Sequence, residues 1–310
     1  MDQQMPFTTY NKLPSVLRKH VLSYCNYHEL FEYSQCSNAC NFDIQCFDQV
    51  APRMVLICES NGVITIHMKY EQRKSFELEF QNVGEQNCHK MSLIQNYKKT
   101  VSYEEKTGSA YDAAIRWLKH RFTYYTGPET QKLVMSLEKW PAELVNLPMF
   151  RKIPDWNLTI SKSTSSDFLT YMSSNEHIKE LTLSTDTKKQ TTLYLPYRFF
   201  ESKWFKKLES FTSTIPSQIS DHDFITSNAT FLCLNSKTIS AHAVNTKLMK
   251  WKENRKPLYL HLSGQYMEPM IVQDELPFEY VLGKGRIMYN RDGLKGRIEF
   301  GCDIISFNAM

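Results

Sequence analysis

Short leucine-containing strands recur along the second half of the chain, and their spacing constrains the fold more than any other feature. We predict strands around Met135, Leu158, Leu181, Leu208, Leu232 and Leu260. The steps between these positions are 23, 23, 27, 24 and 28 residues. A unit of this length cannot bury the apolar face of its strand alone, so neighbouring copies must stack into one core.

Helix-like segments lie between these strands, at residues 167–172, 197–205, 221–226 and 241–251. A strand, a helix and a return to a parallel strand form the unit of leucine-rich repeats, which are roughly 20 to 29 residues long. We therefore expect a leucine-rich-repeat-like αβ solenoid over residues 129–310, ending in a hairpin of residues 286–290 and 296–302. An ordinary α/β domain with evenly spaced strands is the alternative.

A different pattern precedes the repeats. Three apolar or alternating segments occupy residues 54–80, and Asn61-Gly62 between the first two accepts the positive φ of a hairpin turn. Residues 109–122 hold an amphipathic helix with alanines, Trp117 and Leu118 on one side. This pattern predicts a β-meander with one helix over residues 51–128.

The first helical period of the chain lies between Leu13 and about Cys25, with Pro14 at an early position that a helix tolerates. Leu30 and Phe31 open a second helical stretch. We expect a small helical module over residues 7–50. The fold class predicted for the whole chain is therefore mixed, α+β or α/β.

Two segments resemble a known family. Residues 13–39 resemble the F-box in Leu13-Pro14, Val21-Leu22, Tyr24, Leu30-Phe31, Ser34 and Ser37. Residues 229–264 resemble the domain that accompanies the F-box in a large group of nematode proteins. The matching positions are Leu232, Leu234, Ile239, Val244, Asn245, Leu248, Trp251, Leu258, Leu260 and Leu262.

This resemblance implies a substrate-recognition subunit of a Skp-cullin-F-box ubiquitin ligase. The F-box would dock a Skp-family adaptor, and through it a cullin, while the C-terminal domain would bind an unidentified target protein. The candidate adaptor-binding residues are Leu13, Pro14, Val16, Leu17, Val21, Leu22, Leu30 and Phe31. Two alternatives remain: these residues pack on the downstream domain, or the protein is a repeat-type binding scaffold without a ubiquitin-ligase connection.

The charge of the chain does not imply nucleic acid, because the net charge of +4 is small and spread along the sequence. The densest basic run, residues 247–256, surrounds Trp251, which would suit phosphate contacts and base stacking. However, Val244, Leu248 and Trp251 recur at helical spacing. This pattern predicts an amphipathic helix whose lysines, Lys247 included, point outward.

We find no constellation of residues that would carry out a reaction. The cysteines near His28 lack the paired spacing of zinc sites, and Asp221 in Asp221-His222-Asp223 is explained as a helix cap. Cys233 lies in an apolar alternating run, which gives no reason to expect a reactive thiolate. We expect a protein that is not an enzyme and has no cofactor, metal or catalytic residue.

The N-terminal residues and the apolar runs bear on location. Residues 1–6 lack the basic and apolar pattern of a secretory signal. No apolar run approaches the ~18 residues of a membrane span. We expect a cytoplasmic or nuclear protein with reduced cysteines and no membrane partner.

Overall fold

The structure is a computed structural model, and the chain divides into two compact units. The first unit comprises Met1–Val134 and Pro141–Ile153, and the second comprises Met135–Trp140 and Pro154–Met310. The structure describes residues 13–23, 25, 33, 36–37, 40, 43, 52–70, 75–83, 89–95, 98–105, 108–122, 130–161, 165–173, 177–185, 193–253, 256–264, 280–282, 285–290, 292–300 and 304–309.

The first unit contains helix α1 (Ser15–Ser23) and an antiparallel meander. The strands of the meander follow each other in chain order: β1 (Met54–Ser60), β2 (Val63–Lys69), β3 (Ser75–Asn82), β4 (His89–Gln95) and β5 (Lys98–Glu105). Asn61 and Gly62 have φ of 53° and 74°, which confirms the predicted turn between β1 and β2. The sequence did not predict β4 and β5, because segments such as KKTVSYEE are too polar to stand out as strands.

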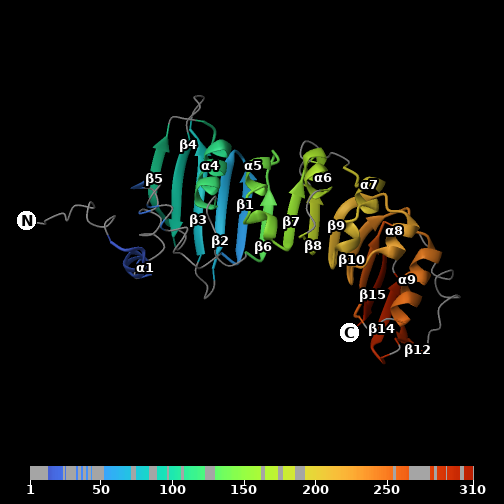
Figure 1. Ribbon diagram of the computed structural model, residues 1–310. Coiled ribbons are helices and arrows are strands. Elements are labelled where there is room, and N and C mark those ends of the chain that lie inside the picture. The colour runs from blue at the N-terminus through green and yellow to red at the C-terminus, as the bar shows by residue number, and fades with distance from the viewer. Residues whose placement is uncertain are drawn as a thin grey trace, which may run out of the picture. The chain divides into compact units, whose positions relative to one another are not determined.

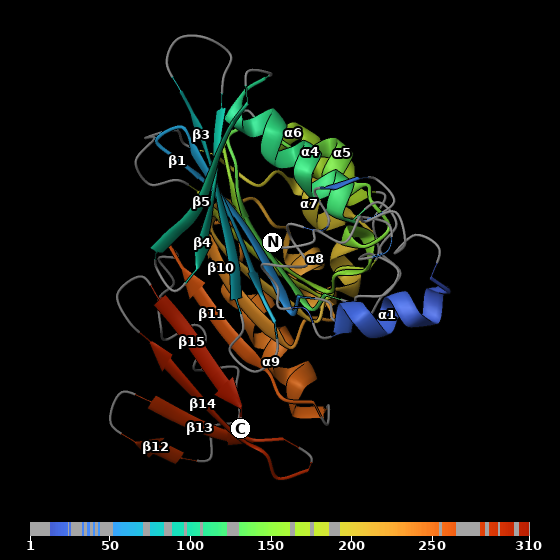
Figure 2. The same cartoon turned by 90° about the vertical axis from the view of Figure 1, so that its left-hand side faces the viewer.

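Helix α4 (Ala110–Phe122) packs on strands of this meander, as Figures 1 and 2 show. Its first turn is capped by Ser109, whose Oγ accepts a hydrogen bond from the Asp112 amide at 3.1 Å. Short helical segments α5 (Ala142–Val145) and η3 (Phe150–Lys152) complete the unit. The Phe122 and Phe150 rings meet edge to face at 5.9 Å, so α4 and η3 share one apolar core.

The second unit is built on parallel strands. The chain enters it through β6 (Lys132–Ser136). Successive parallel neighbours are β7 (Asp155–Ile160), β8 (Glu180–Thr185), β9 (Ser210–Ser217), β10 (Phe231–Ser236) and β11 (Tyr259–Ser263). Figure 1 shows β7, β8, β9 and β10 side by side in chain order.

Helices lie on one face of these strands, as Figure 2 shows. They are α6 (Ser165–Ser173), α7 (Tyr197–Glu201), η4 (Phe205–Lys207), α8 (Asp221–Thr226) and α9 (Ala241–Glu253). Side chains alternate along each strand, so Leu158, Leu183 and Leu234 are buried beneath the helices while their neighbours in sequence are more exposed. The expected helix over residues 197–205 is divided into α7 and η4.

The register differs from the one that the leucine spacing suggested. Equivalent positions on neighbouring strands are Trp156, Leu181, Phe211, Leu232 and Leu260, which are 25, 30, 21 and 28 residues apart. Leu208 is not in a strand, because it ends η4 two residues before β9 begins. The aromatic residues Trp156 and Phe211 hold positions at which the repeat pattern predicts leucine. The pattern thus identified the strands and misplaced their alignment.

The C-terminal strands extend the sheet with antiparallel pairing. They are β12 (Tyr280–Leu282), β13 (Gly285–Tyr289), β14 (Lys295–Phe300) and β15 (Ile304–Ala309). The predicted hairpin is confirmed as β13 and β14, and its turn is closed by Asn290, whose Oδ1 accepts from the amide of Leu294 at 2.8 Å. It is β15 that pairs with β11, so the last strand joins this hairpin to the parallel strands. The architecture is mixed α/β, and the described strands of neither unit close into a barrel.

Candidate functional site

One side of α1 is anchored by contacts with residues that follow it in the chain. Leu22 is buried, and Arg18 Nη1 donates hydrogen bonds to both carboxylate oxygens of Asp43 at 2.6 and 2.7 Å. The Tyr33 hydroxyl donates to the same carboxylate at 3.3 Å. Because Arg18 and Leu22 are four positions apart, they lie on one side of the helix.

The other side of α1 presents apolar residues to solvent. Val16 is 75% exposed, Leu17 is 50% exposed and Val21 is 45% exposed. Leu17 and Val21 are one turn apart and share one side of the helix, and Val16 lies about 100° around the helix axis from Leu17. These three exposed apolar residues are here called the α1 stripe. The side chains that the sequence grouped as adaptor-binding are thus divided between two sides of the helix.

The remaining candidates occupy different environments. Leu22 is buried on the anchored side of the helix, away from the α1 stripe. Leu13 is half-buried and Pro14 is exposed, and the Pro14 carbonyl accepts the Leu17 amide at 2.9 Å to begin the helix. Leu30 and Phe31 lie outside the described residues.

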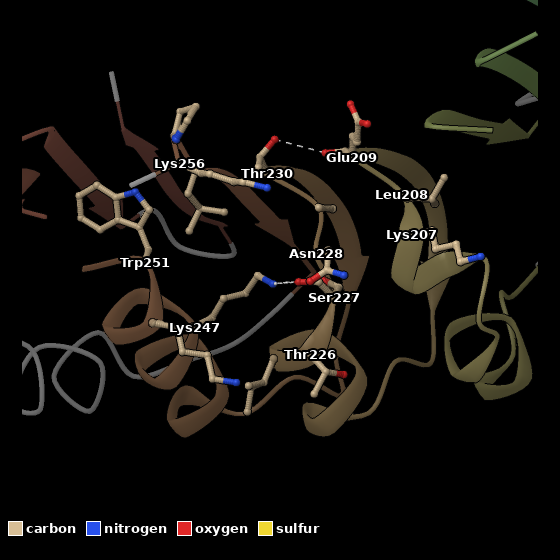
Figure 3. A pocket seen from close by; sticks show the side chains of 15 residues that line it. Lys207, Leu208, Glu209, Thr226, Ser227, Asn228, Thr230, Lys247, Trp251 and Lys256 are labelled. Atoms are coloured by element: carbon tan, nitrogen blue, oxygen red, sulfur yellow. Dashed lines mark hydrogen bonds between the residues drawn. The ribbon is translucent and has the colours of Figure 1, made fainter. Parts of the chain in front are cut away.

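A pocket of about 790 Å³ lies in the second unit, where the C-terminal ends of α8 and α9 meet the beginnings of β9, β10 and β11. Figure 3 shows Lys247 and Trp251 reaching it from α9, and Thr226 to Asn228 from the end of α8. Two hydrogen bonds fix its wall. The side-chain amide of Asn228 donates to the Lys206 carbonyl at 2.9 Å, and the Thr230 hydroxyl donates to the Glu209 carbonyl at 3.3 Å.

Lys247 is buried in this wall, which corrects the expectation that it points outward. Its Nζ donates to the carbonyls of Phe224 and Ser227 at 2.9 and 3.0 Å, and to the Ser227 hydroxyl at 2.9 Å. Desolvation, with a smaller contribution from Lys250, lowers the pKa of the Lys247 ammonium from 10.5 to about 7. Lys247 lies between Val244 and Trp251 at helical steps of three and four, so it shares their inward side.

Trp251 is a core residue and not a surface on which bases could stack. It is 3% exposed, and its ring meets that of Phe307 edge to face at 4.8 Å. This burial leaves no face of the Trp251 ring on which a base could stack. The indole Nε1 has no acceptor among the described residues.

Asp221 has a role different from the one predicted. Ser220 caps α8, because its Oγ accepts from the Asp223 amide at 3.1 Å. The Asp221 carboxylate instead accepts from the backbone amide of Ser240 at 2.8 Å and from its hydroxyl at 2.5 Å, just before α9 begins. Asp221 therefore ties the beginnings of α8 and α9 together.

The strand face opposite to the helices of the second unit carries small and polar side chains. In register across neighbouring strands lie Asn157, Thr182, Thr212, Cys233, His261 and Ser306. One step toward the strand beginnings, the rings of Phe231 and Tyr259 stack at 4.3 Å, and Phe231 is 39% exposed. A polar surface with an aromatic pair is of the kind that protein interfaces use.

Other features bear on the remaining expectations. Burial raises the pKa of the Cys233 thiol, which keeps it protonated at neutral pH. Within the described ranges, histidine, cysteine and acidic residues form no group that could hold a metal ion, and His28 and Cys46 lie outside those ranges. No helix of the described residues is long and apolar enough to span a membrane.

The chain matches no family model, no curated protein and no solved structure.

Proposed function

We propose that the protein is a non-catalytic substrate-recognition subunit of a Skp-cullin-F-box ubiquitin ligase. The N-terminal module is an F-box that docks a Skp-family adaptor, and the second unit is a leucine-rich-repeat-like domain that binds the target protein. The adaptor joins the complex to a cullin, and catalysis is supplied by other subunits, which gain rate from the proximity of the bound target. The complex acts in the cytoplasm or the nucleus.

The α1 stripe carries this proposal. Three apolar side chains exposed on one short helix are costly in water unless a partner covers them. A helix face in a groove of the partner is a common recognition mode, in which a few apolar anchors supply most of the affinity. The other side of the helix is held by Leu22 and by the Arg18–Asp43 ion pair, so α1 is oriented before it binds.

The strength of the contact follows from the exposed fractions. Val16, Leu17 and Val21 together expose the equivalent of about 1.7 whole side chains. Because burying one such side chain is worth about 2 kcal/mol, complete coverage of the stripe contributes about 3 kcal/mol. That contribution corresponds to roughly a hundredfold in Kd.

The test is a binding assay between the purified full-length chain and a Skp-family adaptor. We expect Leu17→Asp/Val21→Asp to weaken binding by roughly a hundredfold or more, since a buried carboxylate adds a desolvation cost to the lost contact. Ser15→Asp is the matched control, because this exposed residue lies on α1 outside the stripe. Its Kd should stay within about threefold of wild type, as for a surface charge.

A protein-binding scaffold without a ligase connection is the alternative, and the same assay separates the two. Both functions use the second unit to hold a target, but only the ligase subunit binds the adaptor. Wild-type protein that fails to bind, or a double variant that binds as well as wild type, would refute the docking role of α1. Unfolding of the second unit should be unchanged in the variants, since the substituted side chains are exposed.

A further inference from the structure

The side of the second unit's sheet that faces away from the helices has charged residues only at its two ends. We call this side of β8, β9, β10, β11, β15 and β14 the open face, and Figure 2 shows helices on the other side. On the four central strands, β9, β10, β11 and β15, its side chains are half-buried or exposed, and none is an acid, a lysine or an arginine. A centre poor in charge with charged residues around it is the usual anatomy of a protein interface.

One row of side chains crosses the open face in register. From β8 to β14 it consists of Glu180, Ser210, Phe231, Tyr259, Asn308 and Arg297. The row therefore begins with a carboxylate, has the stacked rings of Phe231 and Tyr259 at its centre, and ends with a guanidinium. Arg297 alternates with the buried residues Gly296 and Ile298, which places its side chain on the open face.

Both charged ends of the row are accessible to a partner. Glu180 is exposed and forms no ion pair among the described residues. Arg297 is 49% exposed, and its Nη2 bonds the Glu299 carboxylate on the same strand at 2.7 Å. An exposed pair of this kind contributes little, and a guanidinium has several N–H donors, so Arg297 can take a second carboxylate.

The two charges lie at equal distances from the aromatic pair. Glu180 is two strands to one side of Phe231, and Arg297 is two strands to the other side of Tyr259. With neighbouring strands about 4.8 Å apart, each charge lies roughly 12 Å from the midpoint of the pair. A twofold axis that runs parallel to the strands in front of this midpoint would bring Glu180 of one copy opposite Arg297 of another, and Phe231 opposite Tyr259. An axis across the strands would instead bring Glu180 opposite Glu180.

We propose that the open face binds the open face of a second copy of this chain, in a dimer with the first of these axes. Each interaction occurs twice in such a contact, so two pairs of Glu180 with Arg297 flank a central cluster of the Phe231 and Tyr259 rings of both copies. Charge complementarity fixes the orientation, and the aromatic rings supply buried apolar area. A different partner would not require an acid and a base to be equally far from the centre, and this equality favours a second copy. The proposal does not depend on the ligase role.

The size of the open face predicts a weak dimer. Its six strands, about 4.8 Å apart and with about five residues each at roughly 3.3 Å per residue, give about 500 Å² on each copy. A total of about 1,000 Å² is at the lower limit for a specific interface, where complexes are transient. We therefore expect a Kd of about 1 to 100 μM for the dimer.

The test is analytical ultracentrifugation of the purified full-length chain between about 1 and 300 μM, a range that brackets the expected Kd. Wild type should sediment as a monomer and a dimer in rapid exchange. Glu180→Arg and Arg297→Glu should each raise the Kd about tenfold or more, because both charge pairs of the dimer become repulsive. Glu201→Arg makes the same charge change at an exposed residue of α7, on the helix side, and should leave the Kd within about twofold of wild type.

The twofold symmetry allows a stronger test with the charge-reversed variants. The double variant Glu180→Arg/Arg297→Glu restores opposite charges at both contacts, so its Kd should return to within about threefold of wild type. Mixing equal amounts of the two single variants should also restore dimers, because the arginines of one variant then face the glutamates of the other. A change in bulk charge explains neither result.

Three results would overturn the proposal. A wild-type chain that stays monomeric at the highest concentration would exclude the dimer. Single variants that dimerise as strongly as wild type would show that the two charges do not face each other. Failure of both the double variant and the mixture to restore dimers would contradict the twofold arrangement.

The variant Leu17→Asp/Val21→Asp separates this contact from the α1 stripe. It should dimerise as wild type does, because its open face is unchanged, whereas loss of the dimer would assign the contact to the stripe and overturn the proposal. Adaptor binding by a wild-type chain that does not dimerise refutes the open-face contact alone. A dimer that fails to bind the adaptor refutes the ligase role and leaves the open-face contact supported.

Discussion

The buried ammonium of Lys247 makes the stability of the second unit depend on pH in a defined direction. Burial lowers its pKa from 10.5 to about 7, so the unfolded chain holds this proton more tightly than the folded chain does. The free energy of unfolding must therefore rise as pH increases from about 7 toward 10.5, by up to about 1.4 kcal/mol per pH unit. Between pH 6 and pH 9 the rise amounts to about 2 to 3 kcal/mol.

Lys247→Met isolates this contribution, because methionine keeps most of the volume and does not titrate. Urea unfolding at pH 6, 7, 8 and 9, followed by tryptophan fluorescence and circular dichroism, gives the free energy of unfolding of both proteins. The charged groups around the site are present in both proteins, namely Lys250 on α9, Asp223 on α8, and Lys207, Glu209 and Lys256 in the pocket lining. Their own pH dependence therefore largely cancels in the difference.

We expect the stability of wild type relative to Lys247→Met to increase by about 2 to 3 kcal/mol from pH 6 to pH 9. The sign follows because at pH 6 the folded protein bears the cost of a buried charge, and at pH 9 it does not. Lys237→Met, at an exposed position, should show no such trend. A difference that stays constant within about 0.5 kcal/mol over this range would refute the reasoning.

Two further predictions concern packing and an ion pair. Gly296→Ala should cost about 1 to 3 kcal/mol in thermal unfolding, because the added methyl would overlap the ring of fully buried Phe307 and approach Trp251 to 2.8 Å. In Gly293→Ala the added methyl has no neighbour within 4 Å, so this variant should lose only about 1 kcal/mol, for its φ of 79°. Equal losses of stability in the two variants would contradict the packing argument. Asp43→Asn should destabilise the N-terminal module by about 1 to 3 kcal/mol and speed amide exchange in α1, since Arg18 loses its carboxylate, and unchanged exchange would contradict this anchor.

The sequence determined which segments become helices and strands in most of the second unit. Alternation and three-to-four-residue periods reflect which side of an element faces the core, and this is a local property of the chain. For this reason α8 matches residues 221–226 and α9 begins at Ala241 as expected. The turn at Asn61-Gly62 was predictable for a similar reason, because positive φ has a local cost that these residues lower.

Tertiary structure decided which of these elements meet and how they align. The register that pairs Trp156 with Leu181, and Leu181 with Phe211, depends on loop lengths and packing, which no local pattern records. Strands β4 and β5 form because neighbouring strands supply hydrogen-bond partners to polar segments. Asp221 likewise accepts hydrogen bonds from Ser240, the residue before α9, because α8 and α9 begin side by side.

The same distinction applies to the two candidate sites. Periodicity placed apolar residues on α1, but only the contacts of Leu22 and Arg18 determine which side of the helix is covered and which is left to a partner. Periodicity also placed Trp251 on the apolar side of a helix and predicted that Lys247 would point outward. It could not tell that oxygens at the end of α8 would hold the ammonium inside, because hydrogen-bond acceptors 20 and 23 residues away offset the cost of burying a charge only after folding brings them together.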